Sequence, residues 1–328
     1  MDDRFVQHSR VSDAAQIIAN ENKFVIESYC FRSQTTSDSK IVKIGSIQSS
    51  IDSSATASVD EVRKGVFEKV EKIIEAAAVE NVNVLCLPEM WYMPYPFYTP
   101  DGVAWRDFAE DVETGASSEL IKKLAAKFKM VIVSPILEKE SDMFFNTTLI
   151  LSTTGNIVGK YRKIHIPPIE QPFLQRGSFD HAIFDTEVGK IGIVICYERH
   201  FPMCWMMHGL SQADIVFNPS AEDANSMSER LWFAEGVNAA VSNGFFTVMV
   251  NRSGTETFRD GRSFSYFGSS YVASPNGYAT PQLSGETEGL LITEIDLDDC
   301  RKVKKEFSIH QNVHLDLYIN KLSQMKLN

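Results

Sequence analysis

The sequence predicts an α/β fold in which helices pack on sheets. Short Ile- and Val-rich segments alternate with longer segments of helical periodicity from residue 41 onward, which is typical of strands that helices cover. The composition agrees, because 44% hydrophobic and 23% charged residues in a chain of 328 residues suit a globular protein with a large core. The length permits two domains, although large α/β domains often run this long as one.

Residues 1–40 are expected to form an N-terminal extension, which precedes one domain over 41–328 that includes the C-terminal tail. Within the extension, residues 13–20 favour a weak helix and residues 24–31 have the composition of a strand. The polar segment 33–39 has no periodicity and is typical of a linker. The role that we consider for the extension is a contact between subunits.

The domain itself is expected to alternate strands and helices. Its first helix, over 59–79, has the clearest start signal, because Ser58 and Glu61 have the spacing of a capping box. Further helices are expected over 118–128, over 227–242 and in part of the tail beyond residue 298. Strands are expected over 41–47, 82–87, 130–136, 146–152, 157–163, 191–195, 214–218, 245–250, 266–273 and 288–295, the fourth and fifth forming a hairpin.

Charge and cysteine content argue against several classes of protein. The formal net charge of −11 disfavours nucleic-acid binding, which needs a clustered basic face. No apolar stretch approaches the roughly 20 residues that span a bilayer, and no secretory signal follows Met1. The five cysteines (30, 86, 196, 204 and 300) are scattered and include no Cys-x-x-Cys pair, which suits a reducing compartment. We therefore expect a cytoplasmic protein with no membrane or nucleic-acid partner.

Cys196 is the candidate nucleophile. It follows the apolar segment 191–195, which predicts a short buried strand. A thiol at the carboxyl end of such a strand is held rigidly while its sulfur faces a loop, and this suits a nucleophile. The alternative is an inert packed cysteine, since free Cys is among the most buried residue types.

Two charged residues stand at similar places in the sequence. Glu89 follows the apolar segment 82–87, and Lys163 ends a predicted strand before a proline-broken loop. Rigid strand ends often carry the residues of a site, so Glu89, Lys163 and Cys196 are candidates to share one. Each charge also has an ordinary interpretation as an exposed side chain near a strand.

A series of ordered motifs runs from about residue 41 to the C-terminus. The motifs are 88–91 (PEMW), 133–138 (VSPILE), 163–167 (KIHIP), 195–197 (ICY), 199–200 (RH), 218–221 (NPSA), 251–252 (NR) with 254–256 (GTE), and 267–273 (FGSSYVA). They resemble the nitrilase superfamily of carbon–nitrogen hydrolases, and within it the β-ureidopropionase branch. The resemblance implies an α-β-β-α sandwich, in which two facing mixed sheets are flanked by helices. It also implies assembly into a homodimer or a larger homo-oligomer.

The resemblance assigns chemistry to the residues that match these motifs. It implies that Cys196 attacks the substrate and that Glu89 accepts the thiol proton and later returns it. Lys163 would stabilise the oxyanion together with the backbone N–H of Tyr197, a substrate-binding position. Glu170 would orient the substrate or assist the second step. The alternative for Glu170 is an exposed loop acid, since exposed Glu is common.

Arg199 resembles the arginine with which hydrolases of N-carbamoyl amino acids hold a substrate carboxylate. A guanidinium suits this role because it binds a carboxylate through two parallel hydrogen bonds. The alternative pairs Arg199 internally with Glu198 or another acid. Two features depart from the β-ureidopropionase pattern: Glu198 stands where that pattern has a small residue, and the loop between Lys163 and Glu170 is a few residues shorter.

The activity that the resemblance implies is hydrolysis of a non-peptide C–N bond without a metal or an organic cofactor. The favoured substrate is N-carbamoyl-β-alanine or a related ureido acid, which would give β-alanine, carbon dioxide and ammonia, a reaction of pyrimidine catabolism. An amidase or nitrilase acting on another N-carbamoyl compound, an amide or a nitrile is the alternative within the superfamily. A catalytically silent scaffold with the same fold is the alternative of another class.

Two other kinds of site are disfavoured. Cys196, His200, Cys204 and His208 recur every four residues, but on a helix such a stripe would span about 18 Å. One zinc ion with bonds of about 2.0–2.3 Å cannot join its ends. A papain-like Cys–His pair using His200 or His165 lacks the sequence signatures of that family around the cysteine.

Overall fold

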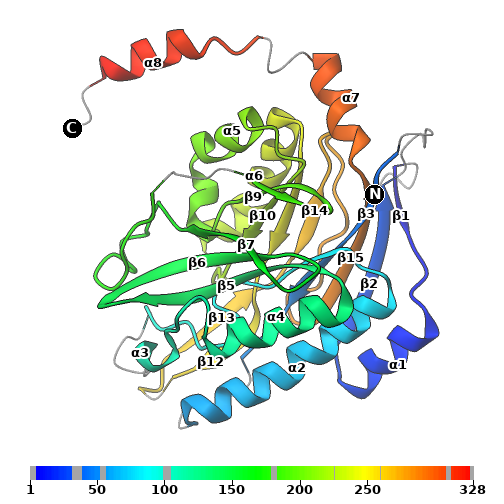
Figure 1. Cartoon of the computed structure of the whole chain (residues 1–328), viewed down its shortest axis with the longest axis vertical. Helices are drawn as coiled ribbons and strands as arrows, with labels where there is room; N and C mark the ends of the chain where they lie inside the picture. The colour runs from blue at the N-terminus through cyan, green and yellow to red at the C-terminus, as the bar shows by residue number, and fades with distance from the viewer. Residues whose placement is uncertain are drawn as a thin grey trace.

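The described part of the chain forms four layers (Figure 1). The computed structural model describes residues 5–31, 39–51, 57–98, 105–178, 183–224, 226–258, 260–307 and 312–325. Two sheets face each other in the middle, α2 and α4 cover the outer face of one sheet, and α5 and α6 cover the outer face of the other. The α-β-β-α sandwich that the resemblance implied is therefore confirmed.

Both sheets are mixed, and most neighbouring strands are consecutive in the sequence. The larger sheet has the order β1 (Val6–His8), β2 (Val25–Phe31), β15 (Gly289–Asp296), β3 (Ile41–Gln48), β4 (Val84–Cys86), β5 (Val131–Glu140), β6 (Met143–Leu151), β7 (Ile157–Arg162). The smaller sheet has the order β14 (Tyr271–Ala273), β11 (Phe246–Val250), β10 (Ile215–Pro219), β9 (Gly189–Ile193), β8 (Phe184–Thr186). The exceptions to sequence order are β15, which lies between β2 and β3, and β14, which lies beside β11. A separate hairpin pairs β12 (Ser253–Thr257) with β13 (Ser263–Phe267).

The helices are mostly amphipathic, and α2, α4, α5 and α6 lie on the outer faces of the sheets. They are α1 (Asp13–Glu21), α2 (Val59–Val79), α3 (Trp105–Phe108), α4 (Ala116–Phe128), α5 (Pro202–Leu210), α6 (Met227–Asn243), α7 (Asp298–Phe307) and α8 (Leu315–Ser323), with a short 3₁₀ helix, η1 (Cys196–His200). The capping box of α2 is confirmed, because Ser58 Oγ accepts from the Glu61 N–H while Glu61 Oε2 accepts from the Ser58 N–H. None of the described helices is both long and apolar enough to cross a bilayer.

Alternation along the strands builds three apolar cores, one between each pair of layers. In β4, Leu85 packs toward α2 and α4, whereas Val84 faces the second sheet. In β10, Phe217 faces the first sheet, whereas Val216 packs toward α5 and α6. Both sheets are therefore covered on both faces, which explains why their strands are almost continuously apolar.

The N-terminal extension is part of the larger sheet. Its β2 runs parallel to β15, and β1 pairs with the far edge of β2. The predicted helix 13–20 and strand 24–31 are confirmed as α1 and β2. The linker expected over 33–39 lies, apart from Ser39, outside the described residues. A contact between subunits through the extension stays a prediction.

The single strand expected over 266–273 was wrong. The chain forms the end of β13 there, turns, and then forms β14. Gly268 and Ser269 have φ angles of +60° and +59°, a left-handed conformation that breaks a strand. Elements that the sequence analysis did not predict are β1, α3, β8, α5 and β12.

Candidate active site

Four strand ends, two from each sheet, carry the candidate site. Glu89 follows β4 and Lys163 follows β7 in the larger sheet, while Cys196 follows β9 and Glu222 follows β10 in the smaller one. One backbone hydrogen bond joins the two sheets here, from Glu89 N to Ser220 O at 3.4 Å. Residues that are more than a hundred positions apart in the sequence thereby meet at one place.

Cys196 occupies a sharp turn between a strand and a helix. It is the first residue of η1 and has a φ of +49°, which is uncommon for a residue with a Cβ. Asn218 in the neighbouring strand stabilises the turn, because its Nδ2 donates to Val194 O at 2.6 Å and to Cys196 O at 3.3 Å. A strained turn that its surroundings hold in place is typical of a residue that must present its side chain in one direction.

Lys163 lies at the centre of a fully buried charge cluster. Its Nζ is 3.0 Å from Glu89 Oε1, 2.9 Å from Glu170 Oε1 and 3.1 Å from Glu170 Oε2. Lys163, Glu89 and Glu170 are all 0% exposed. Asn146 Nδ2 also donates to Glu89 Oε1 at 2.6 Å, and the Tyr95 hydroxyl donates to Glu170. We call Lys163, Glu89 and Glu170 the lysine cluster.

Burial and mutual attraction oppose each other in the lysine cluster. Burial disfavours the charged form of Lys163, but the carboxylates of Glu170 and Glu89 outweigh it and raise the Lys163 pKa well above its usual value. For Glu170, burial dominates and raises the pKa, although the Lys163 ammonium acts in the opposite direction. The lysine is therefore a permanent cation at neutral pH.

One carboxylate oxygen in the lysine cluster has no hydrogen-bond partner within the described part of the chain. Glu89 Oε1 accepts from both Asn146 and Lys163, whereas the buried Oε2 accepts from neither and has no other donor there. A buried carboxylate oxygen without a partner is costly, so such atoms are often reserved for a ligand or for catalysis. Glu89 Oε2 is the atom of this cluster that is available to accept a proton.

The loop that carries Glu89 is fixed by a buried arginine. Arg252 Nε donates to Glu89 O at 3.0 Å, and its other nitrogens bind the carbonyls of Met90 and Met93 and the carboxylate of Glu256. The Asn-Arg and Gly-Thr-Glu motifs at 251–256 therefore supply Arg252 and Glu256. These two residues hold the Glu89 loop in place and contribute no reactive group.

Four nearby charged side chains affect the pKa of the Cys196 thiol. Its Sγ donates to Glu222 Oε1 at 3.2 Å. Burial, followed by the carboxylates of Glu222 and Glu89, raises the pKa of the thiol well above its usual value, while Lys163 and Arg199 act in the opposite direction. Cys196, Glu89 and Lys163 therefore lie close enough together for each charge to act on the sulfur.

Arg199 is held by two acids of its own chain. Its Nε donates to Glu235 Oε2 at 3.0 Å, and its NH1 donates to Glu222 Oε1. The interpretation of Arg199 as internally paired agrees with these contacts, although its partners are Glu222 and Glu235 and not Glu198. Its remaining nitrogen, NH2, is buried and has no partner among the described residues. We call Arg199, Glu222 and Glu235 the arginine cluster.

Glu222 is the site residue that sequence reasoning missed. Burial disfavours its charge, but Arg199 outweighs burial and lowers the pKa of Glu222 to about 2. Its backbone is fixed by Asn251, whose Oδ1 accepts from Glu222 N at 2.9 Å. The sequence did contain a signal for Glu222: an acid stands directly after the 218–221 motif and follows β10, just as Glu89 follows β4.

Glu198 joins the two halves of the site through backbone hydrogen bonds. Its Oε2 accepts from Ile195 N at 2.8 Å, beside the nucleophile, while Oε1 accepts from Ile164 N at 2.8 Å and His165 N at 3.2 Å, beside Lys163. The Tyr161 hydroxyl adds a further bond to Oε1 at 2.9 Å. Glu198 therefore sets the position of the Lys163 loop relative to the Cys196 turn.

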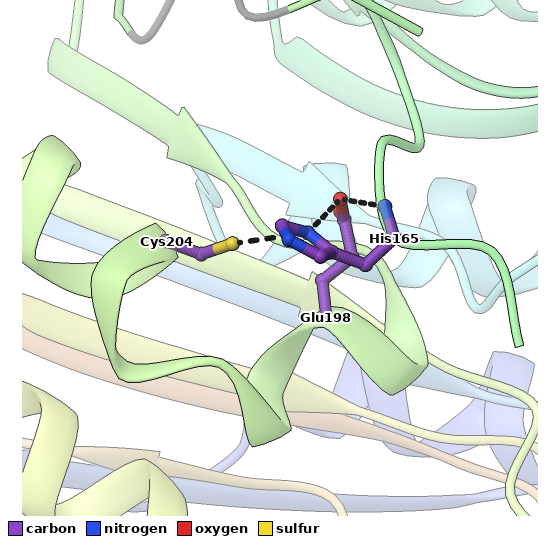
Figure 2. A group of neighbouring side chains, drawn as sticks. All are labelled: His165, Glu198 and Cys204. Atoms are coloured by element: carbon purple, nitrogen blue, oxygen red, sulfur yellow. Dashed lines mark hydrogen bonds and ion pairs between the residues drawn. The ribbon is translucent and has the colours of Figure 1, made fainter. Parts of the chain in front are cut away.

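Figure 2 shows Glu198 beside His165 and Cys204. The ligand atoms of these three residues lie within 4.8 Å of one another, and Cys204 Sγ is 3.4 Å from His165 Nδ1. The Glu198 oxygens already accept backbone and hydroxyl donors, so this carboxylate is occupied by structural bonds and does not suit a metal ion. Two members of the disfavoured zinc stripe have other partners: His200 binds Glu235, and His208 binds Ile193 O.

Tyr197 lies half-buried in η1, with its ring edge-on to His200 and Phe201. Its backbone N–H belongs to the first turn of the helix, where amide groups have no partner within the helix. This position agrees with the expected oxyanion donor, and that role stays a prediction.

Comparison with known proteins identifies the family. The sequence profile of the carbon–nitrogen hydrolase family matches residues 43–305. This chain belongs to the carbon–nitrogen hydrolase family. The nitrilase resemblance is thereby confirmed, and the chain belongs to a family of hydrolases. The two segments outside the match are the N-terminal extension up to β3 and the tail after α7.

The names of several similar proteins describe related hydrolase activities. A β-ureidopropionase from Arabidopsis thaliana is 37% identical over 341 residues, which cover 98% of this chain and 83% of the relative. An N-carbamoylputrescine amidase from Oryza sativa is 27% identical over 76% of this chain and 87% of the relative. The crystal structure of a carbon–nitrogen hydrolase from Helicobacter pylori has the same fold, with a TM-score of 0.78 and 24% identity over 87% of this chain and 100% of that one.

Proposed function

We propose that this protein hydrolyses the carbamoyl C–N bond of N-carbamoyl compounds with Cys196 as its nucleophile. The observation that carries the proposal is the link through Glu198, which binds the residue before Cys196 and the residue after Lys163, together with the unpaired oxygen of Glu89 in the lysine cluster. The similarity to a β-ureidopropionase and to N-carbamoylputrescine amidases supports the substrate class. N-carbamoyl-β-alanine and N-carbamoylputrescine are the substrates to test first.

The first half of the reaction uses all three residues. The Cys196 thiol passes its proton to Glu89 Oε2 as the sulfur attacks the carbamoyl carbon, so that a thiolate need not accumulate despite its raised pKa. The carbonyl oxygen becomes negatively charged, and the Lys163 ammonium and the Tyr197 N–H stabilise it. One such donor contributes roughly 3–4 kcal/mol to transition-state stabilisation. Glu89 then protonates the nitrogen that leaves.

The second half returns the enzyme to its starting state. Water, deprotonated by Glu89, attacks the thioester-like carbon and expels the Cys196 sulfur, which recovers its proton. Glu170, held by Lys163 and Tyr95, positions the substrate nitrogen or this water. The carbamic acid that leaves then breaks its remaining C–N bond, giving carbon dioxide and the second nitrogen product. In total, one N-carbamoyl compound and one water give one amine, one carbon dioxide and one ammonia.

Replacement of the nucleophile tests the mechanism. Cys196→Ala is expected to release no ammonia above background from any N-carbamoyl compound while keeping its circular dichroism spectrum and Tm, because only one buried sulfur is lost. Cys300→Ala, which removes a buried thiol of α7, is the matched control and is expected to retain activity. Ammonia release by Cys196→Ala at a rate comparable to the wild type would rule out the proposal.

A substrate panel tests the reaction class. Ammonia release is measured over N-carbamoyl acids, N-carbamoyl amines, simple amides and nitriles at equal concentration. Activity confined to the N-carbamoyl compounds supports the proposal. Activity confined to amides or nitriles would support the amidase or nitrilase alternative, and no activity at all would favour the silent scaffold.

Two further properties belong to the proposal. A cytoplasmic location agrees with the five cysteines, which are all free thiols. A homodimer or larger homo-oligomer agrees with the exposed apolar side chains of α5 and α6, among them Met203, Phe233 and Val241, and with α8, which buries none of its residues. Light scattering after gel filtration measures the assembly directly, and a monomeric mass would contradict it.

A further inference from the structure

The position of Glu222 raises a question about the far end of the substrate. Glu222 Oε1 is 3.2 Å from the nucleophilic sulfur. A carbon about to be attacked lies roughly 3–3.5 Å from its nucleophile. The attacked carbon therefore lies no more than about 7 Å from Glu222 Oε1, within the range over which the carboxylate acts on a charge of the substrate.

The arginine cluster cannot offer a free positive charge to a substrate carboxylate. Arg199 binds Glu222 through NH1 and Glu235 through Nε, so two carboxylates of the chain share one guanidinium. Only the NH2 nitrogen is without a partner among the described residues, and one nitrogen alone cannot make the paired contact that a carboxylate accepts from two nitrogens of an arginine. A carboxylate of the substrate would also meet the charge of Glu222.

We propose that Glu222 is a specificity-determining residue that disfavours N-carbamoyl acids and favours N-carbamoyl compounds ending in an ammonium group. In this chain, the carboxylate bound to Arg199 is built into the protein. The carboxylate that faces the nucleophile can accept N–H groups or attract a cation, but it repels an anion of the substrate. This inference rests on the proposed function and selects one substrate class within it.

Ionisation of Glu222 supports the inference. Arg199 lowers the pKa of Glu222 to about 2, so the carboxylate carries its full charge at neutral pH. The Glu222 side chain is 9% exposed, whereas the Arg199 side chain is 0% exposed. The Glu222 carboxylate is therefore the member of this ion pair that reaches accessible surface.

The experiment uses three ureas of similar length that differ in the charge at the far end. N-carbamoyl-γ-aminobutyrate ends in a carboxylate, N-butylurea in a methyl group and N-carbamoylputrescine in an ammonium group. We expect the wild type to have a kcat/KM at least about 10-fold higher for the ammonium compound than for the carboxylate, because like charges in contact are strongly unfavourable. A preference for the carboxylate would overturn the inference.

Variants of Glu222 assign the preference to this residue. Glu222→Gln is expected to lower the ammonium-to-carboxylate ratio of kcat/KM at least about 10-fold, because it removes the negative charge and frees Arg199. Glu222→Asp keeps the charge and is expected to retain most of the ratio. Glu75→Gln, a surface acid on α2, changes the net charge equally and should leave the ratio as in the wild type. A ratio within about twofold of the wild type in a folded Glu222→Gln protein would overturn the inference.

Failure of the proposed function is distinguishable from failure of this inference. If the wild type hydrolyses none of the three ureas, the proposed function fails, and the charge preference is then measured by binding. The rise in Tm of the Cys196→Ala protein is recorded with each compound. A larger rise with the ammonium compound supports the role of Glu222, and a larger rise with the carboxylate contradicts it. If Glu222→Gln does not fold, the wild-type preference and the Glu222→Asp ratio decide the question.

Discussion

The lysine cluster and the arginine cluster contain the same charges, one cation and two glutamates, but they are built differently. Lys163 and both of its acids are completely buried, and Glu89 keeps one oxygen without a partner. In the arginine cluster the cation is buried while Glu235 is 20% exposed, and the unpaired atom is a donor, Arg199 NH2. One cluster thus offers an acceptor to the nucleophile, and the other offers a carboxylate and one unpaired guanidinium nitrogen.

The difference follows from the shapes of the two cations. A lysine ammonium is a compact charge with three donors, so Lys163 can hold two carboxylates against one point. A guanidinium is a flat fork, so Arg199 binds its two carboxylates along different edges and keeps a third direction free. The comparison teaches that a charge count alone does not predict function, because the leftover atom decides which chemistry is open.

The largest effect is expected when the lysine cluster loses its cation. Lys163→Met removes the oxyanion partner and leaves two buried carboxylates unpaired, so activity should fall at least about 10³-fold. The free energy of unfolding should also fall, by about 3–5 kcal/mol, as for other buried pairs that lose one member. Ammonia release and urea denaturation measure the two effects.

Lys160→Met, in the strand β7 that precedes Lys163, is the matched control. Lys160 is 36% exposed, and its buried partner Glu138 keeps Arg162, so its loss should cost no more than about 1 kcal/mol. If Lys163→Met were as stable and as active as Lys160→Met, the buried cluster would contribute neither charge nor structure to the site.

The next effect tests whether Glu198 holds the two halves of the site together. Glu198→Gln replaces one acceptor oxygen with a donor, which would then face the Ile195 N–H or the Ile164 N–H. Because two donors cannot share a hydrogen bond, we expect a loss of about 1–3 kcal/mol in the free energy of unfolding. The kcat should fall by about 10- to 100-fold, since a misplaced Lys163 loop disturbs the geometry of attack.

Thermal unfolding and kinetics on the same preparation separate the two consequences. Glu187→Gln is the control, because Glu187 accepts from Thr153 on an exposed turn and should change neither quantity. An unchanged kcat in a clearly destabilised Glu198→Gln protein would show that Glu198 supports the fold without positioning the site.

The sequence predicted the lysine cluster better than the arginine cluster, for a physical reason. Glu89, Lys163 and Cys196 each follow a predicted strand, and the resemblance supplied their roles. Glu222 also follows a strand, but nothing local shows which strand ends converge, because that depends on how two sheets face each other. Pairing across sheets is long-range information that a single sequence does not contain.

Two errors in the predicted elements have local causes. Helix α5 was not predicted, although it begins at Pro202, since proline fits the first helical position where its missing N–H costs nothing. The segment 266–273 reads as one strand because its residues favour strands, while left-handed angles at Gly268 and Ser269 divide it. Long amphipathic α2, with its capping box, was predicted with the correct bounds because all of its signals are local.

The smallest effect sharpens the comparison without breaking either cluster. Burial and the carboxylates of Glu222 and Glu89 raise the pKa of the Cys196 thiol above its ordinary value of 9.0, so the thiolate is scarce at neutral pH in the absence of substrate. Alkylation of Cys196 by iodoacetamide should therefore stay slow between about pH 6 and 8 and accelerate only above the ordinary thiol range, because only the thiolate reacts. Mass spectrometry of the labelled peptide gives the rate at each pH.

In Glu222→Gln one negative neighbour is gone and Arg199 is freed, and both changes favour the thiolate, so the alkylation profile should move to lower pH. If the profile did not move, or moved to higher pH, the arginine cluster would not act on the nucleophile, and the lysine cluster alone would set its reactivity.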